Sequence, residues 1–581
     1  FGLVKVFERW DPARKINTMF WPQGEGDYRM QNPYWIAYRN LRLNQKKRYM
    51  LSAQLSYDIT DWLNISGRVR VDNTHTKYEQ KLYASSNLTI TEESTQGHYT
   101  ISKPDETQTY ADVLANINKR FNDFSLVANV GASIVNNRYE DLSYRGPIRE
   151  KGIPNVFNVF DLDNTKKKAR QDEWQEQTQS IFASVEVGWK SMLYLTLTGR
   201  NDWASQLANS STPCFFYPSV GLSGVISEML TLPEFIDYMK VRGSFSSVGM
   251  PYPRNLTSPT YEYDEANQQW KPKTHYPIKD LKPERTNSWE LGLDMRLFKD
   301  FSLGFSWYLA NTFNQTFDPK VSVSSGYSKI YLQTGYVRNS GVELSLGYGH
   351  TWNNHLHWES NFTLSHNKNT IKDLVTSYIH PETGLPITQN RLDVGGLGKA
   401  RFILKKGGTL GDLYTQSDLK RDNSGMVEID PSGALTTEDN LPDIKLGSVF
   451  PKANLAWNNR FEWRGISLSA LFTARIGGIA YSATQAAMDQ YGVSERSAQA
   501  RDNGGVLLNG RTLVDAQTYY SLIGNSSGLP QYYTYSATNV RLQEASVGYT
   551  IPRKWLGGVC DINVSVVGRN LWMIYCRAPF D

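Results

Sequence analysis

The histidines are the first residues that could bind a metal ion. Three of the eight lie close together in GYGHTWNNHLHW, at His350, His355 and His357. Imidazole nitrogens are common metal ligands, but this segment is typical of a strand, a turn and a second strand. His355 and His357 would then share one face of the second strand, while His350 would belong to the first strand. We therefore predict no metal site at these histidines.

Two further segments resemble ligand-binding loops only loosely. DPSGALTTEDN, at residues 430–440, has the oxygen-rich composition of a calcium loop. It lacks the acidic spacing and the final glutamate of an EF-hand, so an acidic surface loop is favoured over a calcium site. VGGLGKA, at residues 394–400, lacks the Ser or Thr and the flanking strand and helix of a P-loop, and we interpret it as a flexible loop. Calcium is the only cofactor that these segments suggest, and we expect none.

No set of residues with catalytic spacing is recognisable. The sequence has no Ser–His–Asp arrangement and no carboxylate pair that is spaced for acid–base catalysis. The three cysteines, Cys214, Cys560 and Cys576, are odd in number and have no CxxC spacing, so they indicate neither a disulfide framework nor a zinc site. We therefore predict no catalytic residues and no enzymatic activity.

Three segments rich in aromatic and amide side chains could bind a substrate. Aromatic rings stack on sugars or on peptide side chains, while amides and guanidinium groups orient a ligand through hydrogen bonds. The segments are YEYDEANQQW at 261–270, ARDNGGVLLNGR at 500–511 and QYYTY at 531–535. The alternative is that these loops pack on each other or on a partner protein. The predicted substrate contacts are Tyr261, Tyr263, Trp270, Arg501, Asn503, Tyr532 and Tyr533.

The elements that would position these loops are long β-hairpins. Apolar and polar residues alternate through residues 51–59 and again through residues 63–71, on either side of a short turn. Successive side chains of a strand point to opposite faces, so each run has one apolar face and one polar face. About sixteen such runs follow one another with hardly any helical periodicity. They predict an all-β protein that is built from antiparallel hairpins.

Short turns and long connections alternate along the chain. In an up-and-down sheet, this order places all the short turns at one end and all the long loops at the other. That asymmetry is typical of outer-membrane β-barrels, which have short periplasmic turns and long extracellular loops. The short turns lie near 60–62, 122–123, 190–192, 230–235, 299–300, 353–354, 464–465 and 552–560. The predicted loops lie at about 1–45, 85–107, 146–171, 204–214, 250–285, 312–331, 375–450 and 489–537.

In a membrane barrel, one face of each hairpin meets lipid and the other face meets the lumen. No run reaches the eighteen or so apolar residues of a membrane helix, but a barrel strand turns only alternate residues toward lipid. The polar face then lines the lumen, and the predicted lumen-lining residues are Arg68, Arg70, Glu186, Asp294 and Arg296. Aromatic residues at the turn ends predict an interfacial girdle: Tyr57, Trp62, Trp189, Tyr194, Phe298, Phe301, Trp352 and Trp358. The net charge is only +5 and the basic residues are scattered, so no nucleic-acid partner is predicted.

Several motifs resemble the SusC-like branch of the TonB-dependent transporters. LKPERTNSWELGLDMRL, at residues 281–297, is similar to the family strand LKPE-T-x-x-x-E-x-G-x-D. The other matching segments occur in the family's order and cover nearly the whole chain. They are NPYW at 32–35, LTGRNDWAS at 197–205, FFYPSVGLSGVIS at 215–227, N-x-G-V-E-L at 339–344, TNVRLQEASVGYTIP at 538–552 and G-x-N-L at 568–571.

The resemblance implies a TonB-dependent importer of glycan or peptide fragments in the outer membrane of a Gram-negative bacterium. It also implies a SusD-like surface lipoprotein as a lid, energy supplied through TonB, and contact with outer-membrane lipid. The family carries a plug and a TonB-binding segment before the barrel, and a closing strand at its end. We expect residues 1–581 to be one partial transmembrane β-barrel domain of a 22-stranded barrel, with five strands before this chain and one strand after it.

Two other interpretations stay open. A TonB-dependent receptor for metal chelates, or a passive porin, would use a similar barrel. A soluble or surface-anchored β-rich protein that binds or cleaves glycans would expose the polar face to water. Detergent-dependent solubility distinguishes a barrel from a soluble protein, and a co-purifying lid lipoprotein distinguishes the SusC-like branch from chelate receptors.

Overall fold

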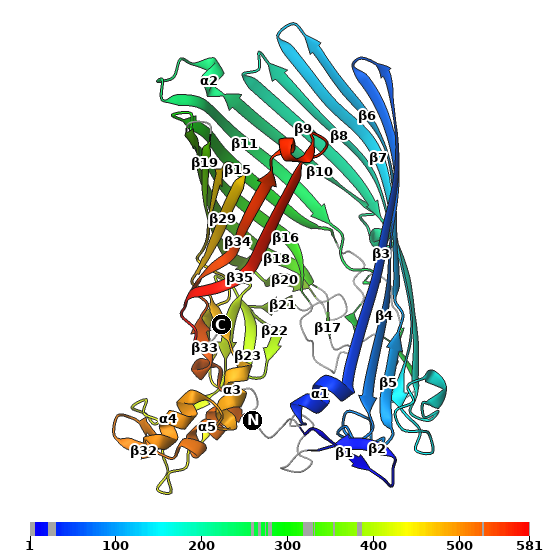
Figure 1. Cartoon of the computed structure of the whole chain (residues 1–581), viewed down its shortest axis with the longest axis vertical. Helices are drawn as coiled ribbons and strands as arrows, with labels where there is room; N and C mark the ends of the chain where they lie inside the picture. Colours follow the sequence, from blue (N-terminus) through cyan, green and yellow to red (C-terminus); the bar gives the residue numbers. More distant parts are fainter. Residues whose placement is uncertain are drawn as a thin grey trace.

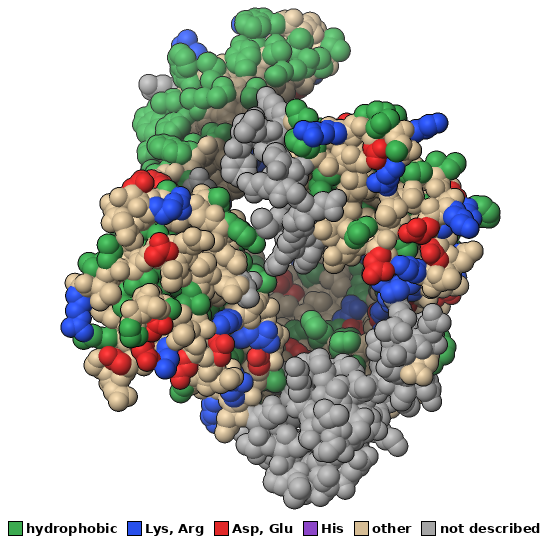
Figure 2. All heavy atoms as spheres, turned by 90° about the horizontal axis from the view of Figure 1, so that it is seen from below, with side chains coloured by type: hydrophobic (Ala, Val, Ile, Leu, Met, Phe, Trp, Pro, Cys, Tyr) green, Lys and Arg blue, Asp and Glu red, His purple; other side chains and the backbone are tan. Residues whose placement is uncertain are grey.

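One large antiparallel sheet, curved like the wall of a barrel, dominates the computed structural model of this chain (Figure 1). Seen from the loop end, the molecule has a central opening with charged side chains around it (Figure 2). Among the described residues, no helix is both long enough and apolar enough to cross a membrane. The structure describes residues 6–20, 31–256, 261–264, 269–272, 275–276, 282–317, 329–330, 332–352, 355–379, 386–525 and 528–579.

The barrel sheet has an up-and-down topology, as the sequence predicts. Seventeen of the described strands form it; β5 and β6 both pair with β4 and with β7 and so share one position, which leaves sixteen positions. The strands are β3 (Asn40–Thr60), β4 (Leu63–Tyr83), β5 (Gly97–Ser102), β6 (Asp105–Phe121), β7 (Phe124–Pro147), β8 (Lys168–Trp189), β9 (Leu193–Ala204), β10 (Cys214–Val225), β11 (Ile236–Met250), β15 (Glu284–Leu297), β16 (Phe301–Phe317), β18 (Leu332–Trp352), β19 (Leu356–Asp373), β28 (Ala453–Trp463), β29 (Ile466–Ile476), β34 (Asn539–Ile551) and β35 (Ile562–Cys576).

The pairing runs from β3 to β35 in sequence order. The sheet closes on itself only through the local ring in which β5 and β6 contact the same two neighbours. No register joins β3 to β35 among the described residues, and these two strands lie apart in Figure 1. The expectation of a 22-stranded barrel therefore stays a prediction.

The alternation of short turns and long connections is also present. The short turns lie together at one end of the sheet and the long connections at the other (Figure 1). The expected turn at 353–354 lies outside the described residues. Several strands extend further toward the loop end than predicted: β3 begins at Asn40 and β5 at Gly97, within segments expected to be loops. In β3 the consecutive polar residues 45–48 interrupt the apolar–polar alternation, and β5 is only six residues long, so the pattern is too short in both segments to predict a strand.

The long connections carry the remaining elements. Before β3 lie β1 (Glu8–Asp11), β2 (Ile16–Met19) and α1 (Pro33–Arg39), and α2 (Ile226–Met229) lies in a turn. The connections that follow β11, β16 and β19 contain β12 (Tyr261–Asp264), β13 (Gln269–Pro272), β14 (His275–Tyr276), β17 (Lys329–Ile330), β20 (Val375–Ile379) and β21 (Pro386–Gln389).

Two connections, at residues 391–448 and 479–536, pack together into what we call the loop subdomain. Its core unites buried side chains from both connections, among them Leu419, Val514 and Ile523. Its elements are β22 (Arg391–Leu397), β23 (Ala400–Lys405), β24 (Asp412–Thr415), β25 (Asp418–Leu419), β26 (Thr437–Glu438), β27 (Ile444–Ser448), β30 (Ile479–Tyr481), α3 (Ala483–Gln490), α4 (Glu495–Asp502), β31 (Val506–Leu508), β32 (Thr512–Val514), α5 (Ala516–Gly524) and β33 (Thr534–Ser536).

The apolar face of the barrel sheet is exposed over most of its length. Leu222 of β10 is 52% exposed, Leu291 of β15 56% and Leu468 of β29 46%, although each belongs to the regular alternation of a strand that has a neighbour on both sides. Leaving a large apolar side chain in water costs about 1.5–3 kcal/mol relative to its burial. A continuous face of this kind is stable where it meets lipid. Aromatic rings border this face at the turn end. The ring centroids of Phe298 and Phe301 lie 6.5 Å apart, and those of Trp352 and Trp358 lie 6.4 Å apart.

Candidate functional site

The residues predicted to line the lumen lie on the polar face of the barrel sheet. Arg68 pairs with Asp112 of the neighbouring strand, with 2.7 Å between Nη2 and Oδ2, and Arg70 donates to the Gln108 amide oxygen at 3.2 Å. Cross-strand pairs of opposite charge stabilise a sheet locally. Both arginines alternate with the apolar residues of β4.

Glu186, Asp294 and Arg296 occupy equivalent places further along the sheet. Glu186 accepts a hydrogen bond from the Thr196 hydroxyl at 3.2 Å. Asp294 lies 3.7 Å from Nε of Arg242, and Arg296 stands opposite Ser302 in the register of β15 and β16. The sequence thus placed all five residues on one face. That this face lines a path for a solute stays a prediction.

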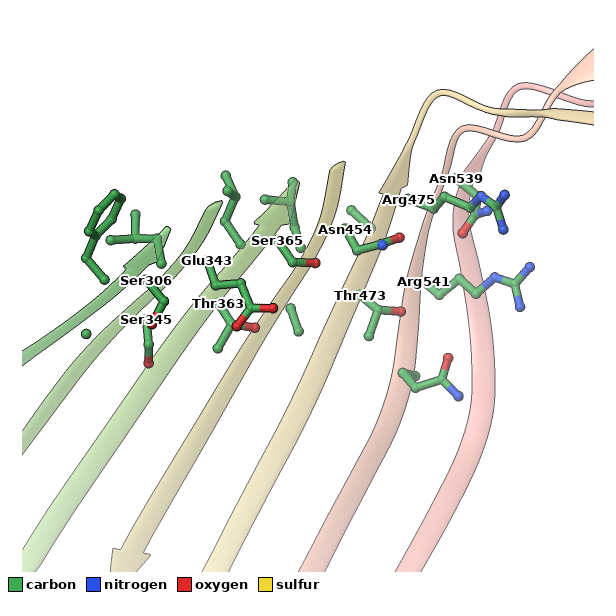
Figure 3. A pocket seen from close by; sticks show the side chains of 18 of the residues that line it. Ser306, Glu343, Ser345, Thr363, Ser365, Asn454, Thr473, Arg475, Asn539 and Arg541 are labelled. Atoms are coloured by element: carbon green, nitrogen blue, oxygen red, sulfur yellow. The ribbon is translucent and has the colours of Figure 1, made fainter. Parts of the chain in front are cut away.

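A hollow of about 730 Å³ lies on the polar face, where β15, β16, β18, β19, β28, β29 and β34 run side by side (Figure 3). The register builds it from two neighbouring rows of side chains, each of which crosses these strands. The first row runs from Asn539 through Arg475, Asn454, Ser365 and Glu343 to Ser306. The second row runs from Arg541 through Thr473, Ala456, Thr363, Ser345 and Gly304 to Asp294.

The hollow is basic at one end and acidic at the other. Figure 3 shows Arg475 and Arg541 gathered at one end, with Glu343 nearer the other. Ser365 and Thr473, which lie between them, are uncharged hydrogen-bonding residues. The sequence prediction named only Asp294 among these residues. The alternation in β18 and β29 marks Glu343 and Arg475 as polar-face residues, but only the register of three strand pairs brings them into one row.

The predicted contacts in the first aromatic loop lie on a small hairpin. Tyr261 and Tyr263 belong to β12, and Tyr263 stands opposite Trp270 of β13 in the register. Trp270 is 68% exposed, so its ring is accessible to a ligand or to a partner. Its contact with substrate stays a prediction.

Arg501 and Asn503 lie at the end of α4 in the loop subdomain, and both are exposed. One Arg501 guanidinium nitrogen donates to the Gly492 carbonyl at 2.9 Å. At the C-terminus of α4, the backbone N–H of Asn503 donates a hydrogen bond to the Gln499 carbonyl, also at 2.9 Å. Their predicted role in substrate binding is neither strengthened nor weakened by these contacts.

Tyr532 and Tyr533 belong to the packed interior of the loop subdomain. The Tyr532 hydroxyl lies 3.3 Å from an Asp418 carboxylate oxygen, and its ring is largely covered. Tyr533 has no exposed surface, and its hydroxyl donates to Oδ2 of Asp489 at 3.0 Å. A substrate has no surface of Tyr533 to contact in this structure. Tyr533 instead fits the alternative expectation, in which these loops pack on each other.

An ion pair between the buried Asp489 of α3 and the partly exposed Arg496 of α4 links these two helices of the loop subdomain. Asp489, 1% exposed, accepts hydrogen bonds from Nε of Arg496 at 2.7 Å, from Tyr533 and from the Ser494 hydroxyl. The Arg496 guanidinium also stacks over the Tyr533 ring, 5.0 Å from its centroid. Burial alone would lower the pKa of Arg496, but its hydrogen bonds to Asp489 and the charge of Asp489 outweigh burial and raise that pKa. The pair is therefore a structural feature of this interior.

A second charged cluster joins the strands of the four-stranded sheet β22–β23–β24–β27. Asp443, whose side chain is 6% exposed, accepts from Nε of Arg391 at 2.7 Å and lies 2.9 Å from Nζ of Lys405. The hydrogen bonds from Arg391, and then those from Lys405, lower the pKa of Asp443 to about 2. Its stabilising contribution is complete above the ordinary carboxyl pKa near 4 and is lost as the pH falls toward 2.

Acidification from pH 5 to pH 2 is therefore expected to lower the free energy of unfolding of this sheet by about 1 kcal/mol. The effect is small because Arg391 is partly exposed and solvent screens its charge. Hydrogen exchange of the backbone amides in β22, β23 and β27 measures the change. Asp443→Asn should remove most of this pH dependence, while Asp439→Asn, at a more exposed ion pair, should leave it in place. An unchanged pH dependence in Asp443→Asn would contradict the assignment.

The segments considered for metal binding are engaged in other contacts. His350 lies 2.8 Å from an Asp300 oxygen, and His357 contacts the Thr351 hydroxyl at 2.9 Å. One oxygen of Asp430 accepts hydrogen bonds from Ser432 and Ala434 within its own turn. In the part of the chain that the structure describes, no three His, Cys, Asp or Glu side chains are arranged to hold a metal ion.

Comparison with known proteins gives one consistent pattern. The model of the family described as "TonB dependent receptor-like, beta-barrel" matches residues 5–571. TonB-dependent receptor P3 of Formosa agariphila is 21% identical over 577 residues, which cover 93% of this chain and 55% of that protein. TonB-dependent receptor P26 of the same organism is 23% identical over 448 residues and covers 71% of this chain.

The fold is similar to that in the structure of the RagAB peptide transporter, with a TM-score of 0.72 at 16% identity. The alignment covers 98% of this chain and 61% of the RagAB chain. At this identity the likeness concerns the fold alone. The chain spans about half the length of the curated relatives that it matches.

Proposed function

This chain belongs to the TonB-dependent receptor-like β-barrel family, and from that membership we propose that it is the barrel part of an importer in the outer membrane of a Gram-negative bacterium. The importer carries glycan or peptide fragments inward, with energy supplied through TonB. A SusD-like surface lipoprotein acts as its lid. No enzymatic step is part of this function.

The observation that carries the proposal is the opposite character of the two faces of the sheet. Large apolar side chains such as Leu55 and Leu195 are exposed on one face, where lipid would cover them. The other face carries paired and unpaired charges and the polar hollow between β15 and β34. A wall of this kind separates lipid from a polar passage.

The fragment class and the lid rest on two further supports. The SusC-like motifs of the sequence imply a lipoprotein lid, and a similar fold occurs in a protein whose structure is described as a peptide transporter. The loop subdomain lies at the loop end, where a lid would sit (Figure 1), and the exposed Trp270 belongs to the long connection between β11 and β15.

Native mass spectrometry of the full-length protein, extracted from its own outer membrane in mild detergent, tests this function. We expect a complex with one surface lipoprotein and bound peptide or glycan fragments, whose masses identify the class. A lid-free protein that carries a metal chelate would favour a chelate receptor. A protein that needs no detergent to stay soluble would contradict the membrane barrel.

A further inference from the structure

Two charged side chains in the polar hollow form no hydrogen bond or ion pair with the residues that the structure describes. Glu343 is exposed on the polar face of β18 and makes no hydrogen bond or ion pair with any described residue. Arg541 of β34 likewise has no such partner within the described ranges, and its Nε is buried without a hydrogen bond. The buried Nε of Arg541 lacks the hydrogen bond that a buried donor normally makes, while the exposed Glu343 carboxylate is accessible to a cation. The Glu343 end of the hollow is therefore suited to a positively charged group of a ligand, and the Arg541 end to a negatively charged group.

The neighbouring charges do not neutralise these two groups. One guanidinium nitrogen of Arg475, beside Arg541, donates to the Val449 carbonyl. The Nε of Arg475 is also buried without a hydrogen bond. Arg242 of β11, three strands from Glu343, pairs with Glu290 and donates to the Ser306 hydroxyl at 2.7 Å. The basic end thus keeps free donors, and the acidic end keeps a free carboxylate.

The register fixes the separation of the two ends. Glu343 and Arg475 belong to one row, with Ser365 and Asn454 between them. Three steps between neighbouring strands of about 4.8 Å each give about 14 Å between their backbones. An extended peptide advances about 3.4 Å per residue, so about four residues span this gap.

We infer that this hollow binds a short peptide with both termini free. Its carboxylate meets Arg475 and Arg541, and its terminal ammonium meets Glu343. Guanidinium groups bind carboxylates through charge-assisted hydrogen bonds, and a carboxylate accepts from an ammonium in the same way. Ser365, Asn454 and Thr473, which lie between the ends, supply hydrogen bonds to the peptide backbone.

This inference rests on the proposed importer function and selects peptides over glycans. A neutral glycan needs neither charged end, and an acidic glycan would use the arginines but leave Glu343 without a role. A zwitterionic peptide of about four residues uses both ends at once. Longer peptides would have to leave the wall before one terminus reaches its partner.

A competition experiment on the full-length protein with its lipoprotein tests the inference. The probe is a mixture of tetrapeptides with free termini, compared with the same mixture after N-terminal acetylation or C-terminal amidation. Bound peptides are measured by mass spectrometry. Free peptides should bind about tenfold or more tightly than either capped form, because each cap removes one charge-assisted contact. Di- and octapeptides should bind less tightly than tetrapeptides.

Two variants assign the ends. Arg541→Gln should weaken the binding of free peptides and reduce the penalty of amidation, since only Arg475 then meets the carboxylate, while it leaves the penalty of acetylation in place. Glu343→Gln should do the reverse. Arg460→Gln and Glu359→Gln are matched controls, because both residues lie on the same face of neighbouring strands but are engaged with Glu462 and Asn361.

The outcomes separate the two proposals. Equal binding of capped and free peptides, or cap penalties that persist in both variants, overturns the inference but leaves the importer intact. A carboxylate of the full chain itself that pairs with Arg541 in a structure of the complex also overturns it. Failure of the wild-type protein to bind any peptide, with a glycan or chelate bound instead, overturns the peptide class itself.

Discussion

Arg496→Met is expected to unfold the loop subdomain while the barrel sheet stays folded. The substitution leaves the carboxylate of Asp489, only 1% exposed, without its cation in the interior. Removing one partner of a fully buried ion pair costs about 3–5 kcal/mol, and the 36% exposure of the Arg496 side chain places the expected cost at about 3 kcal/mol or less. The Tyr533 and Ser494 hydroxyls can still donate to Asp489, but they do not replace the lost charge. Hydrogen exchange of the full-length protein should show loss of protection in α3, α4 and α5, with the barrel strands unchanged.

Two further variants test whether the effect arises from the buried pair. Arg501→Met, in the same helix α4, removes an exposed guanidinium that donates only to the Gly492 carbonyl, so it should cost less than about 1 kcal/mol. Arg496→Met combined with Asp489→Asn removes both charges and should recover part of the loss. Equal effects of the Arg496 and Arg501 substitutions would contradict the structural role of this pair.

Leu195→Arg is expected to destabilise the folded barrel by about 2–4 kcal/mol if the residue lies near the middle of the membrane. Leu195 points to the apolar face of β9 and is 39% exposed, in register with Val187 and Leu222 of its neighbours. Lipid would surround an arginine placed there. Reversible unfolding in urea, with the full-length protein inserted in phospholipid vesicles, measures the change.

The matched control changes the next residue. Thr196→Arg places the same side chain on the polar face beside Glu186, which already accepts a hydrogen bond from Thr196. This variant should alter stability by less than about 1 kcal/mol. The pair Leu55→Arg and Gln54→Arg repeats the comparison on β3. Equal effects at 195 and 196 would mean that lipid does not cover the apolar face.

The barrel sheet could be predicted because its pattern is local. In β4 and β9, each residue's face follows from its neighbour's, so alternation alone identifies the strands and their two faces. The pattern fails after Val71, where β4 continues through residues 73–83 with polar side chains on both faces. Nothing in the alternation of that segment distinguishes a strand from a loop.

The loop subdomain and the hollow could not be predicted because both depend on distant residues. Leu419 and Tyr533 share a core although more than a hundred residues separate them. The aromatic composition of 531–535 suggested ligand binding, yet the same rings are equally suited to packing. Glu343 and Arg541 lie in one hollow only because the register carries their rows across β18, β19, β28, β29 and β34.

Uptake of labelled peptides by whole cells tests the importer most directly. Cells that carry the full-length protein and the proposed lipoprotein, supplied with a mixture of fluorescent tetra- to decapeptides, should accumulate them in the periplasm. Accumulation should stop when the gene is deleted, and also when the proton-motive force that energises TonB is dissipated. Uptake that needs the protein but continues without an energised inner membrane would identify a passive pore and contradict TonB-dependent import.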